Sequence, residues 1–176
     1  KKRLSQVEFD LINYKSQIGK AFGGARTKGN PKVRRPFSRR HLIHLILKSS
    51  KAKGTHSFFI KKTVDSLVKS LASKFGVEIR DYVNVGNHLH LLVKCNHRVY
   101  LSRFLKSLTG LLPRKIFNCE KGHPLGFTFW DGRPFTKIVA EGFKPFQIIR
   151  KYFDKNRWQV LKRVEGFDFY PQVNST

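Results

Sequence analysis

Apolar residues recur along the chain at the two periods that distinguish strands from helices. Short apolar or alternating runs predict strands at 41–48, 77–85 and 88–95, the last two joined at Gly86-Asn87 as a hairpin. Helical spacing predicts helices at 58–75, 100–117 and 143–160. Gly76 follows the first helix as a left-handed cap, and Pro113 is expected to end or kink the second. A bent strand or hairpin is predicted over 127–130 and 135–140.

The predicted elements follow one another as strand, helix, strand, strand, helix, strand and a further helix. This is the order of a ferredoxin-like fold, an α+β arrangement in which two helices cover one face of an antiparallel sheet. The opposite face is left for the additional C-terminal helix or for a functional group.

A length of 176 residues favours one domain with at most a short extra arm. Residues 1–40 are predicted to be a basic N-terminal arm and linker, because helical spacing over 4–18 is followed by a segment rich in Gly, Pro, Lys and Arg. Residues 41–160 form the predicted compact domain, and residues 161–176 an irregular tail.

The charge of the chain points to a polyanionic partner. It holds 36 Lys and Arg against 11 Asp and Glu, a formal net charge of +25, which opposes compaction unless an anion neutralises it. Nucleic acid is the leading partner, because each neutralised phosphate releases counterions. An anionic membrane surface is the alternative, although no long basic amphipathic helix stands out. No apolar run reaches about 18 residues, and no signal segment follows the first residues, so we expect a cytoplasmic protein without a membrane partner.

Two cysteines are too few for a disulfide framework. Cys95-x-His97 and Cys119-x3-His123 together offer four ligands of the kind that zinc prefers. Neither pair has the CxxC spacing of a zinc knuckle, so two unconnected loop pairs are the favoured interpretation.

The strand at 88–95 carries a candidate metal site. Alternate residues of a strand point to opposite faces, so the apolar residues at 89, 91 and 93 face the helices while His88 and His90 share the other face. Their Cα atoms would lie about 6.5–7 Å apart. Two imidazoles at that separation can bind one divalent ion and leave coordination positions for phosphate oxygens. Paired histidines that are hydrogen-bonded on a half-exposed sheet would give the same pattern, and that alternative stays open.

The other chemistry-bearing residues near the strands are less distinctive. His41 and His44 have odd spacing and fall on opposite faces of the first strand. One of them could approach the metal, but a structural histidine with satisfied hydrogen bonds is the simpler interpretation. Asp131 and Glu141 are further possible ligands that nothing in their spacing singles out.

The last helix holds a candidate nucleophile. Tyr152 and Asn156 are four residues apart and lie on the same helical face, while Phe146, Ile149 and Phe153 can anchor another face. A phenol has a pKa near 10, so a nucleophilic tyrosine needs its phenolate stabilised by cations or a metal. The alternative is an amphipathic helix whose tyrosine covers the edge of the core.

These two patterns together resemble a known family. The segment Tyr82–Val93 reads YVNVGNHLHLLV and resembles the histidine–hydrophobic–histidine (HUH) strand of bacterial single-tyrosine transposases. It is most similar to the branch associated with repetitive extragenic palindromes (REP). The helix of that family carries Tyr, three residues, then Asn or Gln, which Tyr152 and Asn156 match. The resemblance covers residues 37–160, including the aromatic residues before the helix.

Two positions depart from the usual pattern of that branch. Val85-Gly86 stands in place of Met-Pro, and Arg157 follows Asn156 where Pro is usual. Relaxases and replication initiators share the HUH chemistry, but relaxases usually place the tyrosine before the histidines, whereas Tyr152 follows them.

The resemblance implies a specific chemistry. His88 and His90 would hold Mg²⁺ or Mn²⁺, with Asn156 completing the site. Tyr152 would attack the scissile phosphate of single-stranded DNA, giving a 5′-phosphotyrosine and a 3′-hydroxyl that can reverse the step. The metal would polarise and orient the phosphate.

The resemblance also implies a bacterial, nucleoid-associated protein whose DNA partner contains a hairpin. The residues that we expect to contact DNA are Arg39, Arg40, Arg133, Lys144, Arg150, Lys151, Lys155 and Arg157. Candidate platforms for base stacking are Trp130, Phe135 and Trp158, for each of which core packing is the simpler role. A basic module that binds DNA or RNA hairpins without cutting, and a domesticated transposase with a host role, are alternatives. The chain is either a monomer or a homodimer in which the tyrosine helix of one subunit acts with the histidines of the other.

Overall fold

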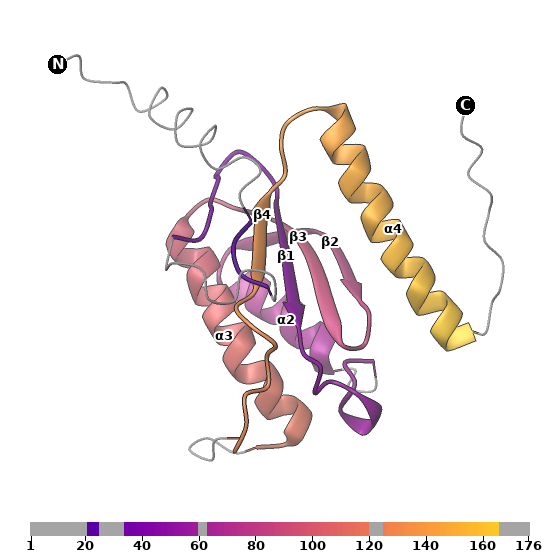
Figure 1. Cartoon of the computed structure of the whole chain (residues 1–176). Coiled ribbons are helices and arrows are strands. Elements are labelled where there is room, and N and C mark those ends of the chain that lie inside the picture. Colours follow the sequence, from indigo (N-terminus) through magenta and orange to yellow (C-terminus); the bar gives the residue numbers. More distant parts are fainter. Residues whose placement is uncertain (1–20, 25–33, 60–62, 120–124, 166–176) are drawn as a thin grey trace.

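In a computed structural model, four strands form one antiparallel sheet in the order β2-β3-β1-β4 (Figure 1). The structure describes residues 21–24, 34–59, 63–119 and 125–165. The strands are β1 (Ile43–Lys48), β2 (Val77–Asn84), β3 (His88–Cys95) and β4 (Phe135–Ile138). The helices are α2 (Thr63–Lys74), α3 (Arg98–Phe117) and α4 (Phe143–Glu165), with a 3-10 turn, η2 (Gly54–His56). This order confirms the predicted ferredoxin-like α+β fold with an additional C-terminal helix. The helix expected at 4–18 and the tail beyond residue 165 lie outside the described residues.

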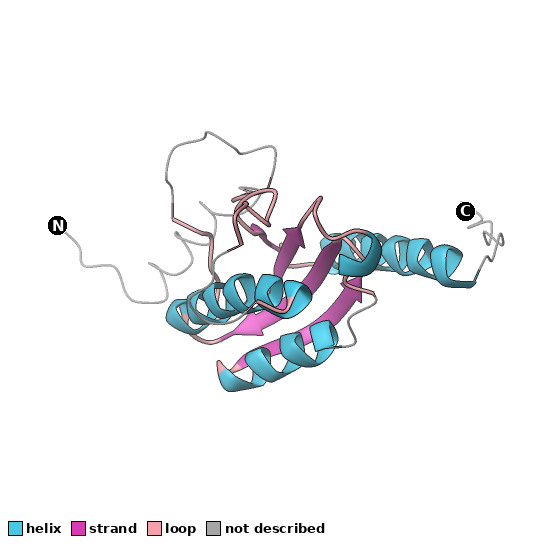
Figure 2. Cartoon of the chain, turned by 90° about the horizontal axis from the view of Figure 1, so that it is seen from below, coloured by secondary structure: helices cyan, strands magenta, loops and turns pink. Residues whose placement is uncertain are grey.

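The sheet separates two apolar clusters. Helices α2 and α3 cover one face, where Leu89, Leu91 and Val93 of β3 are fully buried against them (Figure 2). Helix α4 crosses the other face and packs against Val83 and Leu92 through Phe153, whose side chain is fully buried. Burying a phenylalanine contributes roughly 1.5–3 kcal/mol, so Phe153 is the principal apolar anchor of α4 on the sheet.

A tight turn between β2 and β3 positions the start of β3. Gly86 has φ +90°, and a Cβ atom there would approach the ring of Phe59 to 2.6 Å. Val85 N–H donates to the carbonyl of His88 at 2.9 Å, which closes the turn. Glycine is therefore required at position 86, both for the backbone conformation and for the close approach of a ring. The turn sets the register that directs His88 and His90 toward α4.

The helix does not end at Pro113, which was expected to end or kink it, because α3 continues to Phe117. Proline has no N–H and leaves the carbonyl four residues earlier without its helical donor. That carbonyl belongs to Thr109, and it accepts a hydrogen bond of 2.8 Å from Nε1 of Trp130. A tryptophan from a distant segment therefore replaces the donor that the proline lacks.

The predicted strand or hairpin at 127–130 is wrong, since only Phe135–Ile138 forms a strand in that region. Phe129 is buried in the main core, and its carbonyl accepts a hydrogen bond of 2.5 Å from Ser49 Oγ. The apolar residues at 127–130 therefore reflect packing of an irregular segment onto the sheet rather than a strand ladder. Helix α2 also begins later than predicted, at Thr63, and α4 ends later, at Glu165.

Part of the predicted N-terminal arm docks on the edge of the sheet. Phe22 is buried and exchanges backbone hydrogen bonds with Thr136, at 3.0 and 2.7 Å. The guanidinium groups of Arg35 and Arg133 lie over its ring, at 4.5 and 4.9 Å from the ring centre. The division of the chain at residue 40 stays a prediction. Among the described residues, no helix is long and apolar enough to cross a lipid bilayer.

Candidate active site

Two histidines of β3 lie side by side on the face that α4 covers. The ring centres of His88 and His90 are 4.7 Å apart, with an angle of 79° between the rings. Nδ1 of His88 lies 2.6 Å from Oδ1 of Asn87. An amide oxygen can only accept, so Nδ1 carries the hydrogen in this contact. An outer partner that sets the tautomer in this way is typical of metal-binding histidines.

His90 is buried without hydrogen-bond partners. Its side chain is fully inaccessible, and neither Nδ1 nor Nε2 has a partner among the described residues. Burial, and then the neighbouring His88 and His44, lower the pKa of His90 to about 3. The ring is therefore neutral near pH 7, the form that binds metal ions. Unpaired buried nitrogens cost stability, which indicates a site kept for a ligand.

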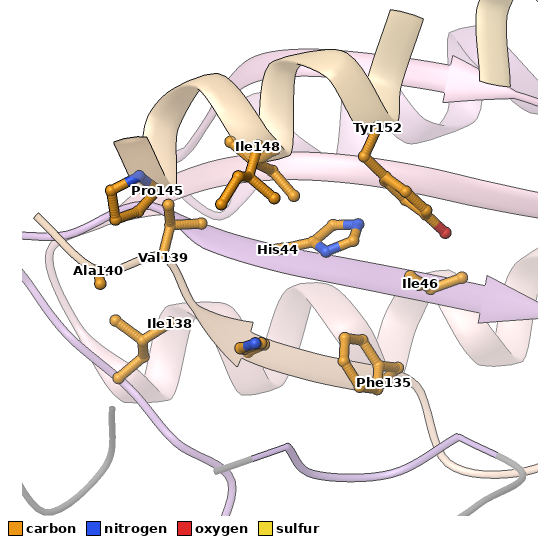
Figure 3. A pocket seen from close by; sticks show the side chains of 11 residues that line it. His44, Ile46, Phe135, Ile138, Val139, Ala140, Pro145, Ile148 and Tyr152 are labelled. Carbon is orange, nitrogen blue, oxygen red and sulfur yellow. The ribbon is translucent and has the colours of Figure 1, made fainter. Parts of the chain in front are cut away.

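Tyr152 of α4 stands against the same histidine. Its ring centre lies 5.2 Å from that of His90 and 5.5 Å from that of His44, in edge-to-face contacts. The side chain is 39% exposed and lines a cleft between α4 and the sheet, and its hydroxyl points away from the helix (Figure 3). Burial raises the pKa of Tyr152, and a hydrogen bond from Asn156 acts in the opposite direction. The tyrosine thus contacts His90, one member of the histidine pair, and His44 of its own chain.

Asn156 lies one helical turn beyond Tyr152 and is buried. Its Nδ2 donates a hydrogen bond of 2.7 Å to the backbone carbonyl of Tyr152. Any contact of this side chain with a cation would therefore be made by the amide oxygen.

His44 of β1 is the residue at this site that sequence reasoning undervalued. It lies on the α4 face, with its ring stacked at 5.8 Å from that of His90. The side chain is 94% buried, since its exposed fraction is 6%, yet Nε2 has no partner among the described residues. Burial, and then Lys137, lower the pKa of His44 to about 4. The expectation of a satisfied structural histidine is wrong for His44.

That expectation holds for His41, which faces the other way. Its Nδ1 lies 2.6 Å from Ser38 Oγ and its Nε2 2.6 Å from Glu141 Oε1. Asp131 accepts a hydrogen bond of 2.7 Å from the backbone N–H of Ser50. Glu141 and Asp131 therefore stabilise loops, and the structure does not bring them to the histidine pair. Cys95 donates to the carbonyl of His97 at 3.3 Å, while His123 lies outside the described residues.

The donor atoms at the site fit a divalent cation. Each nitrogen that binds such an ion lies about 2.1 Å from it, so two ligating nitrogens are at most about 4.2 Å apart. The ring centres of His88 and His90 are 4.7 Å apart, and this separation permits such a distance between their nitrogens. Within the described ranges, no group of three or more His, Cys, Asp or Glu side chains is placed to hold a metal. The site therefore offers two imidazoles and leaves the remaining positions to a substrate or water.

Cations line a second cleft on the other side of α4, which we call the basic groove. It has a volume of about 640 Å³ and is lined by basic residues from β2, β3, α4 and the segment before β1. These basic residues are Arg40, Arg80, Lys94, Arg150 and Arg157. Arg157 forms ion pairs with Asp81 and Asp154, and Arg80 with Glu78 at 2.9 Å. In the described part of the chain, Arg40, Lys94 and Arg150 form no ion pair.

The remaining candidate DNA contacts line neither of these two clefts. Lys144, Lys151 and Lys155 are exposed on α4, Arg39 precedes β1, and Arg133 lies over Phe22 beside β4. Of the candidate stacking residues, Trp130 is held in the core by its bond to Thr109, whereas Phe135 contacts His44 at 5.9 Å. Arg80, Lys94 and Lys137 are basic residues near the site that the sequence did not single out, since each stands alone within a strand.

Comparisons with known proteins identify the class and then the family. Residues 38–156, a range that includes the histidine pair, Tyr152 and Asn156, match the family described as "Transposase IS200 like". The protein is thus a DNA transposase by class, and the chain belongs to the IS200-like transposase family. Membership implies DNA as the partner and a general activity of cleaving and rejoining DNA. It confirms the transposase family expected from the histidine strand and the tyrosine helix.

Among solved structures, the chain is similar to a protein of Deinococcus radiodurans R1 that is described as a "putative transposase". The two share 15% sequence identity with a TM-score of 0.42, over 72% of this chain and 98% of that chain. A comparison with curated proteins found no match.

Proposed function

We propose that this transposase is a metal-dependent endonuclease and strand transferase of the HUH type, which acts on single-stranded DNA containing a hairpin. The observation that carries the proposal is the contact of Tyr152 with His90, at 5.2 Å between ring centres within one chain. A tyrosine beside two imidazoles combines a nucleophile and a cation site around one position for a phosphate. The REP-associated branch and a nucleoid location belong to the same proposal.

The Tyr152 hydroxyl is the proposed nucleophile. Its oxygen forms a bond to the scissile phosphorus while the bond from phosphorus to the 3′ oxygen breaks. The proton lost by the phenol balances the proton gained by the departing 3′-hydroxyl, and the 5′-phosphotyrosine keeps the energy of the phosphodiester. Attack by a 3′-hydroxyl in the reverse direction rejoins a strand. Because burial raises the pKa of Tyr152, the free enzyme holds the phenol protonated near pH 7.

His88 and His90 would hold Mg²⁺ or Mn²⁺, and the amide oxygen of Asn156 would complete the site. When bound, the ion supplies Lewis-acid polarisation of a phosphate oxygen. The contribution of the chain is to hold two imidazoles in fixed orientations, one by its bond to Asn87 and the other by burial.

The proposal is tested by trapping the covalent intermediate. The protein is incubated with Mn²⁺ and a hairpin-bearing single strand, which is labelled at its 5′ end in one reaction and at its 3′ end in another. We expect an adduct that survives a denaturing gel. Only the fragment 3′ of the cut should be retained with the protein, because the linkage is to a 5′-phosphate. Tight binding without any adduct, across strands of varied flanking sequence, would instead favour a hairpin-binding module that does not cut.

The basic groove is proposed to hold phosphates of the bound strand. For single strands, the slope of log affinity against log salt concentration falls in magnitude by about 0.7 for each phosphate contact removed. We expect the double variant Lys94→Gln/Arg150→Gln to reduce the slope by about 1.4 in titrations between low and moderate salt. The matched control is Lys69→Gln/Lys106→Gln, which removes the same charge from exposed positions on α2 and α3. Equal slopes for the two variants would show that the groove makes no particular contact.

A further inference from the structure

A cleft beside Tyr152 has features of a ligand site that the cleavage chemistry does not use. It lies between the edge of the sheet and the first turns of α4, with a volume of about 500 Å³ (Figure 3). Aliphatic residues form most of its walls, Ile46 and Ile138 from the sheet and Ile148 from α4. Phe135 and Tyr152 stand at one end, with His44 between them. This volume falls within the range of about 300–1,000 Å³ that small organic ligands occupy.

One polar atom in this apolar cleft has no partner. His44 lines the cleft and is 94% buried, since its exposed fraction is 6%, and its Nε2 lacks a hydrogen-bond partner among the described residues. A buried unpaired nitrogen in an apolar wall costs stability unless a ligand completes it. The occupant should therefore be a flat apolar group that also carries a hydrogen-bonding edge.

We propose that this cleft receives one unstacked nucleobase of the DNA strand, next to the phosphate that Tyr152 attacks. The inference rests on the proposed function, because it is the position of Tyr152 that brings a strand to the cleft. Tyr152 contacts His90 and also forms part of the cleft wall, so a strand with its phosphate at the hydroxyl continues along the cleft opening. Nucleobases have the required chemistry, since each has a π-face and an edge of donors and acceptors.

The rings around the opening suit a stacked base. Phe135 and Tyr152 each lie edge-to-face with His44, at 5.9 and 5.5 Å between ring centres. Both rings also line the cleft, so they can contact a base that is bound in it. Lys137 is exposed at the same wall and can neutralise the backbone phosphate of the bound nucleotide. A second copy of the chain fits this cleft poorly. Its net charge of +25 would repel Lys137 and the nearby Lys144 and Lys151.

The experiment compares two strands that differ only in their bases. We measure binding of fluorescent 12-residue oligothymidylate and of a 12-residue abasic deoxyribose phosphate strand, in EDTA so that no cleavage occurs. The wild type should prefer oligothymidylate by about tenfold, the size of one base–aromatic stacking contact. Ile148→Asp places a charge in the cleft wall at a side chain that is already 69% exposed, and should reduce the preference to about twofold.

The matched control is Gln147→Asp, which adds the same charge at the neighbouring exposed residue of α4 outside the cleft. It should weaken binding of both strands equally and leave the preference for bases unchanged. An equal loss of preference in both variants, or no preference in the wild type, would overturn the proposal. Circular dichroism of each variant establishes that the fold is retained.

Two further readouts keep the outcomes distinct. Oligonucleotides with 5-iodouracil should crosslink to Phe135 or Tyr152 in peptide mapping, and crosslinks confined to other segments would contradict the site. If sedimentation shows that Ile148→Asp converts a dimer into a monomer with an unchanged base preference, the cleft is an interface between copies instead. If an adduct forms but the protein shows no preference for bases, the proposal of a base in the cleft is rejected and the proposed cleavage stands. If the protein prefers bases but forms no adduct, the proposed cleavage is rejected and the base site stands.

Discussion

Tyr152→Phe is expected to lower formation of the covalent adduct by more than about a thousandfold while leaving noncovalent DNA affinity unchanged. The substitution removes one oxygen and keeps the ring that contacts His90 and His44 at 5.2 and 5.5 Å. Since the ring is 39% exposed and its packing is preserved, the fold of α4 should not change. A time course on denaturing gels measures the adduct, and fluorescence anisotropy with the same strand measures binding.

The chain offers a matched control for this substitution. Tyr100 is 41% exposed, close to the value for Tyr152, and lies on α3 across the sheet, where it contacts only the ring of His97 at 5.1 Å among the aromatic contacts described. Tyr100→Phe should form the adduct at the rate of the wild type. An adduct that persists in Tyr152→Phe, or that is lost in Tyr100→Phe, would assign the nucleophile to another residue.

The sequence predicts on which face of the sheet each histidine lies, but it does not predict which groups surround that histidine. Strand alternation places His88 and His90 opposite the helix-facing leucines, and the structure agrees because β3 is regular over its eight residues. The same rule puts His44 on one face of β1 but does not show whether Nε2 has a partner. That depends on the register of β1 against β3, in which Ile46 pairs with His90, and on the position of α4. Both are long-range features that no local period encodes.

The incorrect predictions share that cause. Pro113 was expected to interrupt α3, but a tryptophan in a distant segment donates to the carbonyl that the proline leaves open. The apolar residues at 127–130 read as a strand, although Phe129 is buried from an irregular segment. In both places the deciding hydrogen bond joins segments about twenty or more residues apart, at 21 and 80 positions of separation. The extra helix was predicted, whereas the two clefts that flank it follow only from its packing angle on the sheet.

His90→Leu is expected to stabilise the metal-free protein while abolishing adduct formation. The two ring nitrogens of His90 are buried without partners, and leaving a buried polar group such as this imidazole unsatisfied costs about 1–3 kcal/mol. Leucine of similar volume fills the same space between Phe153 and Val83 without that cost, so the free energy of unfolding should rise by about 1–3 kcal/mol. Urea denaturation in EDTA measures this change.

The same variant tests the metal site without reference to activity. Binding to the folded state raises the melting temperature in proportion to the logarithm of ligand concentration over its dissociation constant. Mn²⁺ should therefore raise the melting temperature of the wild type and leave that of His90→Leu unchanged. The control is His97→Leu, the same substitution at an exposed position before α3, which should alter neither stability nor the Mn²⁺ shift. A destabilised His90→Leu that still responds to Mn²⁺ would mean that His90 is a packing residue, and that the unpaired nitrogens serve no cation.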